Sequence, residues 1–368
     1  MKTIPLNDLS RISPDEVAEL TDMFEQICTS GSYLKGTYTS QLESDLSARF
    51  ANRPTIAVAN GTDALTLAVA SLQLAPSSRI AVVPNAGGYS SIAVRRLELS
   101  TVFVDIDLHT AQMSPDSLRN VLEIDSTIGA VIVTHLYGLC GEIEKISALC
   151  KHFDIPLIED CAQSIGAVVS GQPVGTFGDI ATLSFYPTKN LGGLGDGGAV
   201  VCRDSGIAEL VRELAQYGWS SRYVIASLNG FNSRIDEIQA AILSARLPKL
   251  DLLNSVRTKI IQRYSQALSE PRHLFFSRDR NFVGHLAILV TPTRDADASF
   301  LQSKNISTGI HYPLLDTEQP AWVPEDIQWQ NLIPYARQLN EQILTLPCFP
   351  TMTEEEIAHI CQTLSQLP

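Results

Sequence analysis

The chain has 368 residues, of which 45% are hydrophobic and 18% are charged. At roughly 150 residues per domain, this length allows two or three domains with a large core, and the composition is that of a folded protein rather than a disordered one. The formal net charge of −13, without a run of basic residues, makes nucleic acid and anionic membranes poor candidates as partners.

Targeting and metal-binding patterns are missing from the sequence. Residues 1–8 have no apolar segment of the kind found in signal peptides, and apolar runs such as 286–290 are far shorter than the roughly 20 residues that cross a bilayer. The seven cysteines are scattered and form no CxxC pair. This argues against a disulfide framework and a zinc site. We therefore expect a cytoplasmic protein without a metal.

Short apolar, β-branched runs alternate with helical patterns through the first two thirds of the chain. They predict strands at 55–59, 79–84, 101–105, 127–135, 155–160, 180–186 and 198–202. Apolar residues at helical spacing predict helices at 63–74, 114–121 and 143–153. Several strands are apolar throughout, as expected when helices cover both faces of a parallel sheet. The alternation predicts an α/β domain with a large parallel or mixed sheet.

The pattern changes in the last third of the chain. Residues 235–268 read as a long helical stretch interrupted at Pro248, and a strand pattern at 283–291 and a segment at 306–310 follow. A helix is predicted at 354–364. We therefore predict a large ligand-binding α/β domain over residues 1–245 and a small α+β domain over residues 246–368.

The first chemical motif follows the first predicted strand and reads Asn60-Gly61-Thr62-Asp63. Gly61 permits a tight turn, and Thr62 or Asp63 can cap a helix whose free N–H groups can bind a phosphate. An ordinary helix cap without a ligand would have the same pattern.

The second motif ends the strand at 155–160 with a carboxylate, Asp160. In an open α/β sheet, ligands bind at the carboxyl ends of the strands. An aspartate there can keep a pyridine nitrogen protonated, and Gln163 can donate to a hydroxyl on the same ring. The alternative is that Asp160 only caps the following turn and that Gln163 is a surface amide.

The third motif is Lys189, which lies between the strand at 180–186 and a loop with five glycines in residues 192–198. The strand fixes the lysine, and the glycines let a planar group approach the bare backbone. A lysine that forms a Schiff base with pyridoxal phosphate needs both. Ser184, at the end of the same strand, can bind the phosphate.

These motifs occur together and in an order that makes the chain resemble the DegT/StrS family of nucleotide-sugar aminotransferases, which depend on pyridoxal phosphate. The resemblance covers essentially the whole chain. The matching stretches are 60–65, 103–107, 135–138, 159–163, 184–198, 232–234, 236–243, 309–313 and 346–350.

The resemblance implies a fold of PLP fold type I, like that of aspartate aminotransferase, in a homodimer with shared active sites. It implies that Lys189 bonds to the cofactor and moves the proton, that Asp160 pairs with the ring nitrogen, and that Gln163 contacts the phenolic oxygen side. The implied phosphate ligands are Gly61, Thr62, Asp63, Ser184 and, on the cofactor of the partner subunit, Asn232. The implied substrate residues are His311, Tyr312 and Arg222.

One segment departs from the family pattern. Where the family usually has Pro-x-x-Thr-aromatic, with the aromatic ring stacked on the cofactor, this chain has Gly87 and Gly88, followed by Tyr89. We take Tyr89 as the candidate for the stacking ring. The alternative is that Tyr89 is an ordinary packed tyrosine and that another residue covers the ring.

The expected activity is transfer of an amino group, usually from glutamate in this family, to a keto-deoxysugar nucleotide. The stretch 217–223, which contains Arg222, is similar to that of members that aminate C3, and it favours a dTDP-linked 3-keto-6-deoxyhexose; a loop packed on the sheet edge is the alternative. A cyclitol ketone as substrate and a regulatory protein without turnover stay open. A sugar dehydratase is disfavoured, since relatives of that kind carry histidine in place of Lys189.

Overall fold

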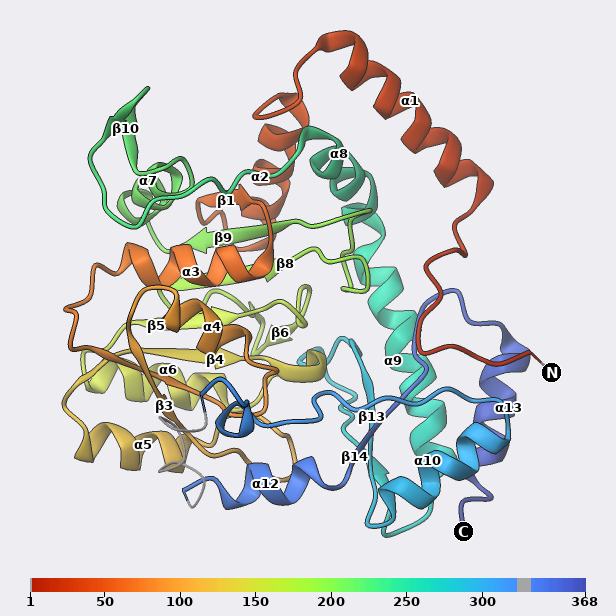
Figure 1. The fold of residues 1–368 in the computed structure, drawn as a ribbon. Coiled ribbons are helices and arrows are strands. Elements are labelled where there is room, and N and C mark those ends of the chain that lie inside the picture. The colour runs from red at the N-terminus through yellow and green to blue at the C-terminus, as the bar shows by residue number, and fades with distance from the viewer. Residues whose placement is uncertain (1, 323–331) are drawn as a thin grey trace.

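The computed structural model describes residues 2–322 and 332–368, and its centre is a seven-stranded sheet in the order β1-β9-β8-β5-β4-β2-β3 (Figure 1). Its strands are β1 (Thr55–Val58), β2 (Arg79–Val82), β3 (Ser100–Phe103), β4 (Ile128–Thr134), β5 (Leu157–Asp160), β8 (Ile180–Ser184) and β9 (Gly198–Cys202). All seven strands predicted from the apolar runs are confirmed.

The sheet is mixed rather than parallel throughout. Neighbouring strands from β3 to β8 run parallel, whereas β9 is antiparallel to both β8 and β1. Strands β5 and β9 are buried along their whole length because helices cover both faces of the sheet. The carboxyl ends of β4, β5 and β8 therefore meet at one edge, where α/β sheets bind their ligands.

Helix α3 (Gly61–Ser71) begins after Asn60, whose side chain accepts the Asp63 N–H. Asn60 is therefore the cap, and the prediction of Thr62 or Asp63 was wrong because both lie inside the first turn. Helix α5 (Pro115–Ile124) begins after Ser114, whose side chain accepts the Ser117 N–H. The other helices that precede the small sheet are α1 (Pro14–Ser30), α2 (Thr37–Arg49), α4 (Tyr89–Arg95), α6 (Ile143–His152), α7 (Ser205–Leu214), α8 (Glu237–Arg246) and α9 (Leu250–Ala267). The interruption predicted at Pro248 is a single 3₁₀ turn between α8 and α9.

The C-terminal third forms a second, three-stranded antiparallel sheet. It consists of β12 (His273–Leu274), β13 (Ala287–Val290) and β14 (Ile343–Leu346), with α10 (Arg294–Ser303), α12 (Pro334–Asn340) and α13 (Glu354–Leu364) around it. The helix predicted at 354–364 is therefore confirmed. The segment at 306–310 forms no strand and makes only isolated bridges.

The N-terminal residues lie with the C-terminal sheet and not with the large one (Figure 1). Ile4 pairs with Ile306, and the side chain of Ile4 is 1% exposed. The division predicted between residues 245 and 246 falls in the last turn of α8 and stays a prediction. Ile4 is held by burial against a segment about 300 residues away in the chain.

Two shorter antiparallel pairs complete the fold. They are β6 (Val168–Val169) with β7 (Gln172–Pro173), and β10 (Trp219–Ser221) with β11 (Val224–Ile225), which projects beside α7 (Figure 1). Within the described ranges, the search for a helix with the length and apolar character of a membrane span found no candidate. All seven cysteines are free thiols.

Candidate active site

A cavity of about 490 Å³ opens at the carboxyl ends of β4, β5 and β8, next to the start of α3. Nine residues that the sequence analysis selected line it: Gly61, Thr62, Tyr89, Asp160, Gln163, Ser184, Lys189, His311 and Tyr312. The chain folds residues from five separate stretches into one site. Asp63, Arg222 and Asn232 are not among the residues that line this cavity.

One end of the cavity is formed by the start of α3, which lies directly against the end of β8. A β-carbon at Gly61 would lie 2.6 Å from Cβ of Ser184 and 3.0 Å from its Oγ, so only glycine permits this approach. The N–H groups of a first helical turn have no acceptor within the helix. Asn60 takes the N–H of Asp63 at 2.8 Å, which leaves those of Gly61 and Thr62 beside the Ser184 hydroxyl. This arrangement suits an anion such as phosphate.

Asp63 lies at the same helix start, but its side chain does not reach the cavity. Its carboxylate accepts a hydrogen bond from Nη1 of Arg96 at 3.0 Å. A carboxylate facing the cavity would repel a phosphate, so this ion pair turns a negative charge away from the anion site.

The middle of the cavity holds the carboxylate of Asp160. Its Oδ1 accepts the Ala162 N–H at 3.1 Å, and its Oδ2 faces the hydroxyl of Thr134 on the neighbouring strand at 3.4 Å. Burial raises the pKa of Asp160, while the Ala162 N–H and the charge of Lys189 oppose this rise. A cationic ligand group beside Asp160 would therefore be strongly favoured.

Lys189 lies in the turn after β8, where its backbone N–H donates to the Tyr186 carbonyl at 2.8 Å. Burial lowers the pKa of its amine to about 8, although the charge of Asp160 opposes the change. With this pKa, about a tenth of the lysine is uncharged at pH 7 and about half at pH 8. An uncharged amine can act as a nucleophile and as a base.

A chain of hydrogen bonds behind the lysine fixes the neighbouring His285. The Asn190 amide nitrogen donates to Oδ1 of Asn254 at 2.7 Å and to a backbone carbonyl at 3.0 Å, so its oxygen must accept. His285 Nδ1, 2.8 Å from that oxygen, therefore carries the hydrogen. Burial and the nearby Lys189 lower the pKa of His285 well below its ordinary value, which keeps its Nε2 unprotonated.

The wall of the cavity opposite the sheet comes from the segment of His311 and Tyr312. His311 Nδ1 lies 2.8 Å from the Thr345 hydroxyl on β14. Gln163 Oε1 accepts the N–H of Tyr137 at 2.7 Å, which directs its Nε2 into the cavity, 3.3 Å from the Tyr312 hydroxyl. The small sheet thus contributes directly to the site.

The sequence analysis did not identify His285, Asn190 or Tyr137 as site residues. Asn190 follows Lys189 directly, which was an available signal. Tyr137 lies within the family-like stretch 135–138, which was a second signal. His285 has no local pattern that marks it, because its position depends on a contact with the distant Asn190.

Arg222 and Asn232 lie on the surface near the β10–β11 pair. The Arg222 guanidinium lies 4.9 Å from the centre of the Tyr223 ring, and Asn232 Oδ1 accepts from Nε of Arg234 at 2.9 Å. Both are exposed. Neither residue lines the cavity of its own chain, so the roles predicted for them toward substrate and cofactor would require the cavity of a partner subunit.

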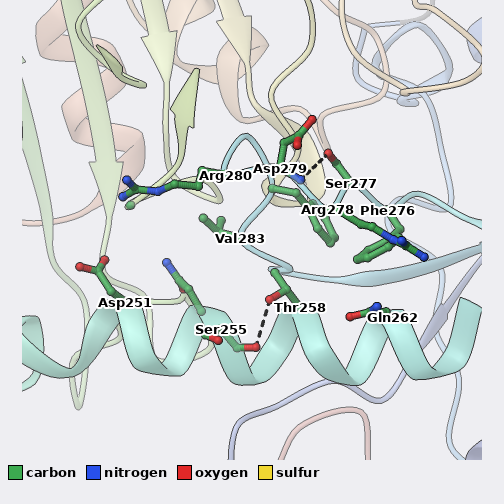
Figure 2. Close-up of a pocket in the computed structure, with 13 residues that line it drawn as sticks. Asp251, Ser255, Thr258, Gln262, Phe276, Ser277, Arg278, Asp279, Arg280 and Val283 are labelled. Carbon is green, nitrogen blue, oxygen red and sulfur yellow. Dashed lines mark hydrogen bonds between the residues drawn. The ribbon is translucent and has the colours of Figure 1, made fainter. Parts of the chain in front are cut away.

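A second cavity, of about 370 Å³, lies between α9 and the segment 276–283 (Figure 2). Its α9 side presents Asp251, Ser255 and Thr258, and Arg278 and Arg280 come from the other side. Asp251 already pairs with Arg49 at 2.9 Å, and none of the residues selected from the sequence lines this cavity. Its lining lacks the lysine and buried carboxylate that give the first cavity its chemistry.

A buried cluster of His135, Glu159 and Cys161 also lies beneath the sheet edge, with possible ligand atoms within 4.8 Å of one another. The Glu159 carboxylate accepts three backbone N–H groups of the turn 175–178 as well as facing His135. These bonds use its oxygens to hold the turn. The cluster is a buried polar network rather than an open site.

The donor set of the first cavity fits pyridoxal phosphate. A helix start and a serine suit the phosphate, a buried carboxylate suits the ring nitrogen, and a buried lysine with a lowered pKa suits the aldehyde. The glycine at 61 that lets the two phosphate-binding segments meet supports the same fit.

Comparison with known proteins gives matches over the whole chain. Residues 14–365 match the DegT/DnrJ/EryC1/StrS aminotransferase family. A dTDP-3-amino-3,6-dideoxy-α-D-galactopyranose transaminase of Aneurinibacillus thermoaerophilus is 34% identical, with 99% of each chain covered. A UDP-N-acetyl-3-dehydro-α-D-glucosamine 3-aminotransferase of Acidithiobacillus ferrooxidans is 33% identical, with 98% of this chain and 97% of the relative covered. The crystal structure of S. venezuelae DesV in complex with a ketimine intermediate is 30% identical and superposes with a TM-score of 0.94, covering 100% of this chain and 98% of that one.

Proposed function

Because the chain belongs to the DegT/DnrJ/EryC1/StrS aminotransferase family, we propose that its Lys189 cavity transfers an amino group from glutamate to a keto-deoxysugar carried on a nucleotide. The protein is a pyridoxal-phosphate-dependent sugar aminotransferase. The observation that carries the proposal for this cavity is the buried Lys189, with a pKa of about 8, in one cavity with Asp160 and the start of α3.

The residues that would hold the cofactor follow from the donor set. The N–H groups of Gly61 and Thr62 and the hydroxyl of Ser184 bind the phosphate, and Asp160 pairs with the ring nitrogen. The Nε2 group of Gln163 points into the cavity, where one hydrogen faces the Tyr312 hydroxyl at 3.3 Å and the other would serve the ring oxygen. Bound pyridoxal phosphate supplies an aldehyde that takes up the amino group and a ring that withdraws electrons from the neighbouring bonds.

Lys189 is the residue that moves protons in this scheme. In its uncharged form, the Lys189 amine would take a proton from the α-carbon of the amino donor and deliver it to the cofactor carbon that carries the amino group. Asp160 keeps the ring nitrogen protonated throughout. The Asn190–His285 pair places an uncharged imidazole near Lys189.

For the acceptor we propose a dTDP-linked 3-keto-6-deoxyhexose. The relative with 34% identity is named for a 3-amino-3,6-dideoxy sugar on dTDP, which supports this choice, while the relative with 33% identity is named for a UDP sugar. His311, which lies beside Tyr312 on the wall of the cavity, is the residue that we assign to sugar contacts. NMR of the product would test the assignment, since nitrogen at C4 instead of C3 would contradict it.

We also propose that two chains share their active sites. Arg222 and Asn232 lie outside the cavity of their own chain, beside exposed apolar side chains that need cover in solution. Tyr223 is 71%, Ile225 68% and Leu228 85% exposed. A second copy of the chain would cover these apolar side chains. Arg222 and Asn232 of one chain would then lie at the cavity of the other chain. Sedimentation of the protein should give a dimer, and a monomer would contradict this proposal.

The central test is the bond between Lys189 and the cofactor. The purified protein should show the visible absorbance of bound pyridoxal phosphate, and glutamate should bleach it. Borohydride reduction followed by peptide mapping should find the cofactor on Lys189. Lys189→Ala should lose transamination and still bind pyridoxamine phosphate. A modified peptide without Lys189, or turnover by the variant, would overturn the assignment.

A further inference from the structure

The ring of Tyr312 lies flat on the bare backbone of Gly87. A β-carbon at Gly87 would lie 2.9 Å from Cδ2, Cε1 and Cε2 of Tyr312. Because Cδ2 and Cε1 are opposite corners of the ring, a point equally distant from both lies over the ring and not beside it. One face of the tyrosine is therefore covered by the glycine, and a larger residue at position 87 would displace the ring.

The neighbouring glycine receives an aromatic ring in a similar way. A β-carbon at Gly88 would lie 3.4 Å from the Trp322 ring. Both glycines have positive φ, +76° for Gly87 and +81° for Gly88. The space that side chains at positions 87 and 88 would occupy is thus filled by the rings of Tyr312 and Trp322.

Other contacts hold Tyr312 in this position. Gln163 Nε2 lies 3.3 Å from the Tyr312 hydroxyl, and the hydroxyl of Tyr137 donates to the carbonyl of the preceding His311 at 2.7 Å. The Tyr89 ring meets that of Tyr312 at 74°, with 6.0 Å between the centres. Tyr89 is 45% exposed, whereas Tyr312 is partly buried. Tyr312 is the better fixed of the two rings.

We propose that Tyr312 is the aromatic wall on which the cofactor ring stacks, and that Tyr89 supports Tyr312 at its edge. This inference rests on the proposed function. Tyr312 lines the same cavity as Asp160 and Lys189, and since Gly87 covers one face, the cavity reaches the ring from the other side. Burial of a pyridine ring against it would stabilise the bound cofactor as aromatic pairs stabilise each other.

Binding of pyridoxamine phosphate to the full-length, cofactor-free protein tests the proposal, because this form makes no covalent bond to Lys189. Calorimetry should show about 10-fold weaker binding for Tyr312→Ala and nearly unchanged binding for Tyr312→Phe, which keeps the ring. Tyr89→Ala should weaken binding about 3-fold or less. A larger loss for Tyr89→Ala than for Tyr312→Ala would overturn the proposal and make Tyr89 the stacking ring.

A pair of glycine variants separates ring displacement from backbone strain. Gly171 has φ +81° and no heavy atom within 4 Å of a β-carbon, so Gly171→Ala adds strain alone. Gly87→Ala adds similar strain and also pushes against Tyr312. Both variants should lower the melting temperature, but only Gly87→Ala should weaken pyridoxamine phosphate binding.

Wild-type affinity in Gly87→Ala would overturn the placement of Tyr312. If the wild-type protein itself failed to bind pyridoxamine phosphate, the proposed function would be wrong as well. Intact binding in the wild type together with no effect of Tyr312→Ala would remove this inference alone.

Discussion

Replacing Lys189 by methionine should make the cofactor-free protein more stable at neutral pH. Methionine has similar length and no charge to bury. Burial lowers the pKa of Lys189 from the ordinary lysine value of 10.5 to about 8, which corresponds to about 3 kcal/mol of unfolding free energy. The charged lysine is the form that burial penalises, so the folded protein carries this cost when Lys189 is protonated.

The pH dependence follows from the same difference. Between about pH 8 and 10.5 the unfolded chain holds the Lys189 proton and the folded chain has released it, so stability rises with pH in this window. Below pH 8 the free-energy cost of burying the protonated Lys189 is fully present, and above pH 10.5 this cost is absent. The advantage of Lys189→Met should therefore shrink by about 3 kcal/mol from pH 7 to pH 10.5.

Urea unfolding of the two proteins across this pH range, at one protein concentration, measures the effect. The same comparison in an Asp160→Asn background controls for the carboxylate, which loses a cationic neighbour when Lys189 is replaced. A difference between wild type and Lys189→Met that does not change with pH would refute the reasoning, because it would mean that Lys189 titrates as it does in the unfolded chain.

Three further experiments test the site. Asp160→Asn should lose about 100-fold or more in turnover with little change in melting temperature, since only the charge at the ring nitrogen is lost; unchanged turnover would remove Asp160 from the mechanism. Gly61→Ala should lower both the melting temperature and, by about 10-fold, the affinity for pyridoxamine phosphate. Adding Ser184→Gly should restore the melting temperature and not the affinity, and recovery of both would exclude a phosphate role for Ser184. Mixed dimers of Lys189→Ala and Asn232→Ala subunits should keep one intact site if Asn232 serves the partner's cofactor, and inactive mixed dimers would place it in its own chain's site.

Much of the large sheet and of the site could be predicted from the sequence because both rest on local patterns. The apolar runs of β4, β5 and β8 mark the strands, and the residues that end those strands are brought to one edge by the parallel arrangement. Asp160, Ser184 and Lys189 are therefore found together because each lies at or just after the end of a strand.

The parts that the sequence did not predict depend on contacts between distant segments. His285 owes its position to an amide of Asn190, 95 residues away in the chain. The packing of Tyr312 on Gly87 joins segments from opposite ends of the sequence in the same way. Asp63 shows a different limit: the helix start was predicted, but the direction of its side chain is decided by Arg96.

The pairing of Ile4 with Ile306 has a structural consequence. The polypeptide starts beside the C-terminal residues, builds the seven-stranded sheet, and returns through α9 to build the small sheet (Figure 1). The chain therefore crosses between the two sheets both near its start and through α9, so the segment of His311 and Tyr312 is carried by a part of the molecule to which both termini contribute.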